Sequence, residues 1–374
     1  MNTVVIVDDS PVQRRFLRTA VEADADFSVV GEARNGHEAV ALVARLRPTA
    51  VLMDLDLPLM GGIEAIERIM SASPTPILVY SAFVAGSHSE NALQALAAGA
   101  VDVLAKPGPD DSGTLEQYAV ALRRRLRVAA RVRVITHPRG RLRSQGMVGS
   151  APALGGGSRR PLASTHGLDA LERGTQRGTV KLVVLGASTG GPQALLTVLG
   201  ALPADLTQAV LVVQHMAEGF IPGLASWLDG LVALPVVVGQ SGKRLAPGTV
   251  TIAPSGGNLL VQDDRLRVLC VPPGPGQFHV PGIDATFESV ACALGPDAVG
   301  VLLTGMGRDG AAGLLSLRGR GALTLGQDEA SSTVYGMPAA AFALGAVVRQ
   351  LPLGEIAPAV LAALGRSPVL GPPS

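Results

Sequence analysis

Apolar residues in the first third of the chain follow two patterns that alternate along the sequence. Short, mostly apolar runs occupy residues 4–7, 50–53, 77–80 and 101–105. Between them, residues 12–21, 39–46 and 93–98 carry apolar side chains three and four positions apart, as one face of a helix requires. Strands that alternate with helices predict an α/β fold with a parallel, doubly wound sheet.

The same alternation returns in the second half of the chain. Apolar runs at residues 182–185, 210–213 and 298–303 predict buried strands, and a helix-like segment at 193–199 follows the first of them. We therefore expect a second doubly wound parallel sheet.

A glycine-rich turn follows the run at 182–185. Gly186 and Gly190 frame Ser188 in a G-x-S-x-G arrangement. Such a turn between a strand and a helix lifts a hydroxyl out of the sheet, and the helix N-terminus offers free N–H groups where an oxyanion forms. An ordinary glycine-rich turn has the same pattern, so a nucleophilic role for Ser188 depends on its partners.

His215 follows the run at 210–213 after one residue, Gln214, and Asp309 lies in the glycine-rich turn at 304–310 in which the run at 298–303 ends. Residues just past the carboxyl ends of parallel strands gather in one crevice, so Ser188, His215 and Asp309 are expected to converge. Together they form the nucleophile, base and orienting carboxylate of an acyl-transfer triad. His279 lies in a loop rich in proline and glycine, and we expect it on the rim of the site, in contact with substrate. The alternative is that His279 is the base.

Polar side chains also follow the apolar runs of the first half. They are three carboxylates, a hydroxyl and an ammonium, from Asp8, Asp9, Asp54, Ser81 and Lys106. Clustered carboxylates repel one another unless a hard cation neutralises them, and Mg²⁺ prefers such oxygen ligands. A single aspartate of this kind is usually a helix cap or a solvated loop residue, but five polar residues at four strand ends favour a common site.

Residues 1–125 resemble the receiver domain of response regulators. The resemblance implies a flavodoxin-like fold in which Asp54 is the phosphoacceptor, Asp8 and Asp9 arrange Mg²⁺ with it, Ser81 is the switch hydroxyl and Lys106 contacts the phosphoryl group. Two positions depart from the family pattern: Gly61 replaces a common aspartate, and Val103 replaces a switching aromatic residue. The second departure makes an aromatic-rotamer switch doubtful.

The second half resembles the catalytic domain of bacterial chemotaxis protein-glutamate methylesterases, with a Rossmann-like fold. The matching motifs are 186–192, 214–216, 279–287, 303–310, 327–329 and 335–338. The resemblance places the family's catalytic residues on Ser188, His215 and Asp309, and an oxyanion donor on the backbone of Met306. We expect the backbone at Thr189 to donate to the same oxyanion. Ala217 and Ile221 depart from the pattern, and we expect both to affect the rim of the cleft.

The two resemblances together imply a phosphorylation-activated serine esterase. Its substrate would be a glutamate methyl ester on a methyl-accepting chemoreceptor, with glutamate and methanol as products, and glutamine deamidation would pass through the same acyl-enzyme. The implied partners are the receptor and a sensor histidine kinase of the chemotaxis type. Mg²⁺ is expected in the receiver, and no cofactor in the esterase site.

Composition agrees with two globular domains. Lys+Arg 31 against Asp+Glu 30 gives almost no net charge, so we expect neither nucleic acid nor membrane binding from the chain's overall field. Two cysteines, Cys270 and Cys292, lack metal spacing and suit a reducing compartment. No signal peptide opens the chain, which predicts a cytoplasmic protein. Residues 182–204 lack charge, but their glycines and polar residues make a membrane span unfavourable.

The expected domains are a receiver at 1–126, a flexible linker at 127–178, a catalytic domain at 179–366 and a tail at 367–374. Glycine, proline and serine recur in the linker, which indicates a flexible connector. Arginines recur in it as well, so the alternative is a basic arm that binds an acidic receptor or nucleic acid. Three other functions compete: a DNA-binding regulator, a dinucleotide-binding domain and an inactive scaffold. The second half lacks a basic helix-turn-helix pattern and the G-x-G-x-x-G spacing, which argues against the first two.

Overall fold

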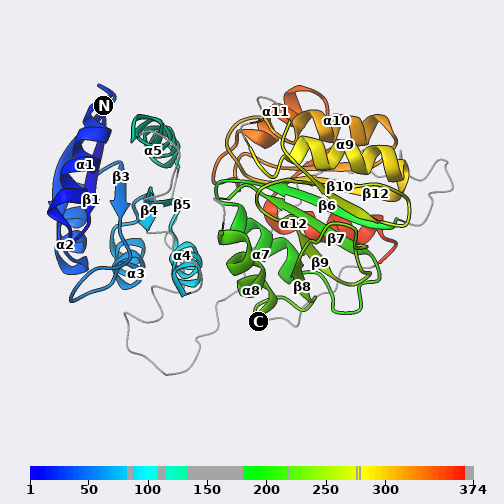
Figure 1. The fold of residues 1–374 in the computed structure, drawn as a ribbon, viewed down its shortest axis with the longest axis horizontal. Coiled ribbons are helices and arrows are strands. Elements are labelled where there is room, and N and C mark those ends of the chain that lie inside the picture. The colour runs from blue at the N-terminus through cyan, green and yellow to red at the C-terminus, as the bar shows by residue number, and fades with distance from the viewer. Residues whose placement is uncertain are drawn as a thin grey trace, which may run out of the picture.

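The computed structural model describes residues 1–81, 87–107, 115–132, 180–216, 219–274, 277 and 279–366, with the backbone alone at 87–90. Figure 1 shows these residues arranged as two α/β domains, each built around its own sheet. Most of the expected linker, all of the expected tail and Ala217 lie outside the described residues.

The first sheet is parallel throughout, with strand order β2-β1-β3-β4-β5, and it confirms the doubly wound fold predicted from the apolar pattern. Its strands are β1 (Asn2–Val7), β2 (Phe27–Ala33), β3 (Ala50–Met53), β4 (Ile77–Ser81) and β5 (Asp102–Ala105). Its helices are α1 (Pro11–Glu22), α2 (Gly36–Leu46), α3 (Gly62–Ala72), α4 (Ser87–Ala97) and α5 (Leu115–Ala129). Helix α5 continues past residue 126, the expected limit of the domain, because Ala129 packs against Val101.

The second sheet has seven parallel strands in the order β14-β13-β12-β6-β7-β9-β8, which confirms the second predicted sheet. Its strands are β6 (Leu182–Ala187), β7 (Ala209–Gln214), β8 (Val236–Val238), β9 (Val250–Ile252), β12 (Ala298–Leu302), β13 (Leu323–Gln327) and β14 (Arg349–Leu351). An antiparallel pair, β10 (Asn258–Val261) and β11 (Val268–Val271), stands apart from it. The helices of the second domain are α7 (Gly191–Gly200), α8 (Phe220–Asp229), α9 (Ile283–Leu294), α10 (Ala311–Gly319), α11 (Met337–Ala343) and α12 (Leu353–Ala363), with a short 3₁₀ turn at Gly295–Asp297.

The central strands are buried along their whole length, as helices on both faces of a parallel sheet require. Every residue of β3, β4, β6, β7 and β12 is buried. By contrast, β2 and β14 lie at sheet edges, where exposed positions interrupt the apolar pattern. This explains why β2 and β14 carry no continuous apolar run. The other edge strand of the first sheet, β5, was marked by such a run because Val103 and Leu104 are buried.

The uncharged segment at 182–204 forms β6, the glycine-rich turn and α7. Within the described residues, none of the helices has both the length and the apolar content that crossing a lipid bilayer requires. Ile221, which was expected to affect the rim of the cleft, lies in the first turn of α8 with its side chain fully buried in the core.

Strand β6 lies at the point where the order of the second sheet reverses. The chain moves from β6 to β7 on one side, and later reaches β12 on the other side. In open parallel sheets such a switch point opens a crevice beyond the carboxyl ends of the strands. Ser188 comes one residue after β6 and therefore stands at this crevice.

Candidate active site and phosphorylation site

Strand register brings Ser188, His215 and the loop of Asp309 together. Ala187 of β6 pairs with Gln214 of β7, so the next residues, Ser188 and His215, lie side by side. On the other flank, the Ser188 N–H donates to the Thr304 carbonyl at 3.0 Å, just after β12. Three segments far apart in sequence thus meet at one end of the sheet.

Asp309 binds the imidazole of His215. The distance from His215 Nε2 to Asp309 Oδ2 is 2.7 Å, and the side chains are 7% and 15% exposed. The same carboxylate accepts from the N–H groups of Ile283, Asp284 and Gly310 at 2.8, 2.9 and 3.0 Å. Burial opposes ionisation of Asp309, but the hydrogen bond and charge of His215 and the backbone donors outweigh it and lower its pKa to about 2.

The other ring nitrogen of His215 remains available for chemistry. Nδ1 is buried and has no hydrogen-bond partner among the residues that the structure describes. A neutral imidazole that donates its Nε2–H to Asp309 carries its lone pair on Nδ1. The arrangement therefore gives Nδ1 the capacity to accept a proton, and no hydrogen bond joins it to Ser188 Oγ within the described residues.

His279 stacks on His215. The ring centroids are 4.6 Å apart and the planes differ by 10°. Burial and, after it, the charge of His215 lower the pKa of His279, so the stacked ring is neutral at pH 7. The sequence pattern gave no sign of this stacking, because no strand pairs the two segments directly.

Two backbone N–H groups near Ser188, one in its own turn and one in the loop after β12, are candidate oxyanion donors. The N–H groups of Thr189 and Met306 donate to no acceptor within the described part of the chain. Gly190, the N-cap residue of α7, has φ +76°, a conformation that favours glycine. At Gly305 a Cβ would lie 2.7 Å from Ser188 Cβ, so only glycine lets the Met306 loop approach the Ser188 turn so closely.

Buried polar side chains at other strand ends hold these loops, and sequence reasoning assigned them no role. The Gln214 amide donates to the carbonyls of Ser188 and His215, both at 2.9 Å. The Thr304 hydroxyl donates to the Thr189 carbonyl at 3.0 Å, and Gln327 Oε1 accepts from the Thr304 N–H at 2.8 Å. A polar residue at the end of an otherwise apolar strand was the available signal.

The first domain gathers its carboxylates by the same kind of register. Val7 of β1 pairs with Met53 of β3, so the following residues, Asp8 and Asp54, lie next to one another. Both are buried, and one carboxylate oxygen each from Asp8, Asp9 and Asp54 lies within 4.8 Å of the others. Three anionic oxygen donors at this spacing, with Asp9 open to solvent, fit a hard divalent cation such as Mg²⁺.

Lys106 lies against two of these carboxylates. Its Nζ is 2.6 Å from Asp54 Oδ2 and 3.0 Å from Asp8 Oδ2, and its backbone N–H donates to the Ser81 carbonyl at 2.8 Å. Burial raises the pKa of Asp54 despite the nearby ammonium. Burial opposes the charge of Lys106 too, but the bond to Asp54 outweighs it and raises the pKa of Lys106.

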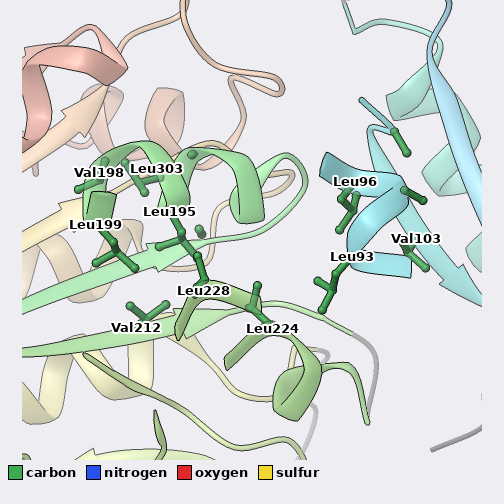
Figure 2. Packing of buried hydrophobic residues seen from close by; sticks show 14 of the residues in the cluster. Leu93, Leu96, Val103, Leu195, Val198, Leu199, Val212, Leu224, Leu228 and Leu303 are labelled. Carbon is green, nitrogen blue, oxygen red and sulfur yellow. The ribbon is translucent and has the colours of Figure 1, made fainter. Parts of the chain in front are cut away.

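The two domains pack through α4. Figure 2 shows Leu93 of α4 facing Leu224 of α8, and helices α7 and α8 both contact α4. The Gln193 amide of α7 donates to the Leu96 carbonyl at 2.8 Å. The apolar cores of the two domains are therefore continuous at this face.

A polar contact joins the first domain to the turn that carries Ser188. Asp102 Oδ2 of β5 accepts from the Thr189 hydroxyl at 3.3 Å and from Arg125 Nη1 at 2.9 Å. Nearby, Val334 packs against Val101 and Val132. A carboxylate from the first domain thus binds the residue next to Ser188, a contact that no sequence motif predicted.

Comparisons with known proteins agree with the two-domain division. Residues 183–360 match the family model described as CheB methylesterase, and residues 4–116 match the response regulator receiver domain. A protein-glutamate methylesterase/protein-glutamine glutaminase of Paramagnetospirillum magneticum is 41% identical over 98% of this chain and 97% of its own. One of Anaeromyxobacter dehalogenans is 42% identical over 94% of each chain. The crystal structure of the Thermotoga maritima CheB methylesterase catalytic domain matches 49% of this chain and 97% of its own, at 31% identity and a TM-score of 0.47.

Proposed function

The chain belongs to the protein-glutamate methylesterase/protein-glutamine glutaminase family, and from this premise we propose how its two sites work. It is a hydrolase in which a response-regulator receiver controls a methylesterase domain in chemotaxis. The proposed substrates are glutamate methyl esters and glutamines of methyl-accepting chemoreceptors. The proposed source of phosphate is a sensor histidine kinase of the chemotaxis type.

We propose that Ser188, His215 and Asp309 act as the catalytic triad. The observation that carries this is the 2.7 Å contact between His215 and Asp309 directly beside the Ser188 turn. Ser188 Oγ attacks the ester carbonyl while His215 Nδ1 takes its proton. Asp309, ionised at neutral pH, fixes the tautomer and stabilises the imidazolium.

The free N–H groups of Thr189 and Met306 would hold the oxyanion of the tetrahedral intermediate. His215 returns the proton to the leaving methoxide, and methanol departs. Water then loses a proton to His215 and attacks the acyl-enzyme, which releases glutamate and restores Ser188. With a glutamine the leaving group is ammonia and the remaining steps are the same. The neutral ring of His279 supports His215 by stacking without adding a second charge.

The receiver site is proposed to accept phosphate on Asp54. Mg²⁺ held by Asp8, Asp9 and Asp54 would neutralise carboxylate and phosphate charge there. Lys106 supplies a cation within hydrogen-bonding distance of Asp54, and Ser81 lies beside it with its hydroxyl as the switch group.

The contacts between the domains support a blocking role for the unphosphorylated receiver. Asp102 binds Thr189, and α4 lies on α7, the helix that follows the nucleophile turn. A bulky receptor helix has to reach the same turn. Phosphate adds roughly −1.5 to −2 charges beside Lys106. Lys106 follows directly on β5, which carries Asp102, so a shift of this strand would weaken the contact with Thr189.

The function is tested with the full chain and membranes that carry methyl-labelled chemoreceptors. The phosphorylated protein should release labelled methanol, the unphosphorylated protein should release it more slowly, and Ser188→Ala should release none above background. A parallel assay of ammonia from receptors with glutamine at the methylation sites tests the deamidase activity. Equal methanol release from wild type and Ser188→Ala would exclude the proposed mechanism.

A further inference from the structure

The first turns of α9 and α10 bind one another through two carboxylates. Asp309, which lies just before α10, accepts from the N–H groups of Ile283 and Asp284 at the start of α9. In return, Asp284 Oδ1 accepts from the N–H of Gly313 in the first turn of α10, at 2.7 Å. Each helix therefore receives its cap from the other, and we call this exchange the reciprocal cap.

Neither helix has a cap of its own. The N-cap residues are Gly282 and Gly310, and glycine has no side chain that accepts a hydrogen bond. Unpaired N–H groups at a buried helix start cost free energy, so an acceptor has to come from elsewhere. The two carboxylates supply it, and their charge suits the positive ends of both helices.

The helix starts are also in direct contact. A Cβ on Gly313 would lie 2.7 Å from the Asp284 carbonyl oxygen and 2.6 Å from Phe287 Cβ. A Cβ on Gly310 would lie 2.7 Å from Ile283 Cγ2. Glycines at both places let the helices approach until a short aspartate spans the gap, and a displaced Asp284 would leave the Asp309 loop without this support.

We propose that Asp284 is a positioning residue for catalysis: through the reciprocal cap it fixes the loop that holds Asp309 on His215. Asp284 does not touch the substrate in this account. Its effect on the rate is indirect. If the Asp309 carboxylate moved away from His215, it would no longer orient the imidazole for proton transfer. Burial beside Asp309 raises the pKa of Asp284 to about 6, so the group is mostly ionised and able to accept at pH 7.5.

The inference rests on the triad proposed above, and its test uses a reagent that needs no receptor. A fluorophosphonate labels an activated serine, so the rate of labelling of Ser188 in the full chain reports on the triad alone. Asp284→Ala removes the acceptor and should slow labelling by ~10- to ~100-fold. Asp284→Asn keeps a carbonyl oxygen in place and should label within ~3-fold of wild type, the range of a conservative change that keeps the hydrogen bond.

Glu288→Ala is the matched control, because Glu288 is the next acidic residue of α9 and is exposed. Its labelling rate should equal that of wild type. Circular dichroism and thermal melting establish which variants fold, and Asp284→Ser, whose hydroxyl falls short of Gly313, replaces Asp284→Ala if the latter does not fold. On receptor substrate, Asp284→Ala (or Asp284→Ser in its place) should have a lower kcat and an unchanged KM.

The outcomes separate the two proposals. If wild type itself is not labelled at Ser188, the triad proposal fails. If wild type is labelled and Asp284→Ala or Asp284→Ser is labelled equally fast, the triad stands and the positioning role of Asp284 is wrong. If Asp284→Asn is labelled as slowly as Asp284→Ala or Asp284→Ser, the charge of Asp284 matters and its hydrogen bond to Gly313 does not, which also overturns the proposal.

Discussion

Both domains collect polar residues at the carboxyl ends of parallel strands, but they give these residues different neighbours. In the first domain, Asp8 and Asp54 follow adjacent strands, so strand register alone sets them side by side. In the second, register brings Ser188 to His215, and Asp309 reaches them only at the end of a loop seven residues beyond β12. That loop is held by backbone donors of α9 and by the reciprocal cap.

The difference follows from what each chemistry requires. A cation site needs several oxygens near one point and tolerates small displacements, because the ion adjusts its ligands and waters. A triad needs one carboxylate, one imidazole and one hydroxyl in a fixed relation. In the first site Lys106 bonds directly to the carboxylates of Asp8 and Asp54. In the second, Gln214, Thr304 and Asp284 brace the loops that carry the site residues.

The largest expected effect breaks the second site at its nucleophile. Ser188→Ala removes one hydroxyl from a turn and should leave fold and phosphorylation intact, yet lower the rate of ester hydrolysis by about four to six orders of magnitude. Methanol release from labelled receptors measures it, with Asp54 phosphorylation as the folding control. Activity within about tenfold of wild type, far less than a lost triad serine costs, would refute the triad.

The next effect separates the two stacked histidines. His215→Gln removes the base bonded to Asp309 and should be nearly as damaging as loss of the serine. His279→Gln removes only the stacked ring, and an aromatic pair contributes about 0.5–1.5 kcal/mol, so the rate should fall by less than about tenfold. The same methanol assay compares them. The reverse order would make His279 the base.

In the first domain, Asp54→Asn should abolish labelling by a small phosphodonor, because it removes the attacking oxygen. Asp9→Ala should slow labelling and weaken Mg²⁺ binding without abolishing it, since Asp54 and Asp8 remain. Asp56→Asn, two residues on and outside the carboxylate trio, is the control. Undiminished base-labile phosphate on the Asp54→Asn protein would show that the acceptor lies elsewhere.

A smaller effect tests the contact between the domains. Asp102→Ala removes the acceptor of the Thr189 hydroxyl, and a hydrogen bond contributes about 1 kcal/mol, so the unphosphorylated protein should become about fivefold more active. Glu116→Ala, an exposed acidic residue on α5, should change nothing. A fragment that starts near residue 178 should be more active than the unphosphorylated full chain. A fragment that is slower would mean that the receiver activates directly instead of blocking.

The smallest effect concerns the stability of the protein between pH 4 and pH 6. The folded-state pKa of Asp284 is raised from 3.8 to about 6, so the fold binds its proton more tightly and loses stability as pH rises through this window. Asp284→Asn should remove this pH dependence. Across the window it amounts to about 1 kcal/mol in the free energy of unfolding, once solvent screening of the half-buried carboxylate is included. Asp309 has the opposite sign, because its pKa is lowered and its contribution is lost only as pH falls from 3.8 to about 2. Thermal melting at several pH values measures both, and an unchanged slope in Asp284→Asn would contradict the assignment.

The apolar pattern predicted both sheets and most central strands correctly, because most strands buried on both faces carry a continuous apolar run. The central strand β13 was not predicted, since its buried Thr324 and Gln327 interrupt the run. The edge strand Phe27–Ala33 was missed for the same reason, since its exposed positions break the run. The three residues of the proposed triad and the carboxylates of the first site were predicted from their places after such runs. Their catalytic and phosphoacceptor roles remain proposals.

What the sequence could not determine depends on contacts between segments that no local pattern relates. The stacking of His279 on His215, the reciprocal cap of Asp284 and Asp309, and the bond between Asp102 and Thr189 each join residues from separate elements. Periodicity and motif spacing report which face of an element is buried, not which side chains meet across an interface. The sequence by itself therefore determined the two sheets and the residues at their strand ends, whereas tertiary packing decided which of those residues touch, how their pKa values move, and where the receiver meets the nucleophile turn.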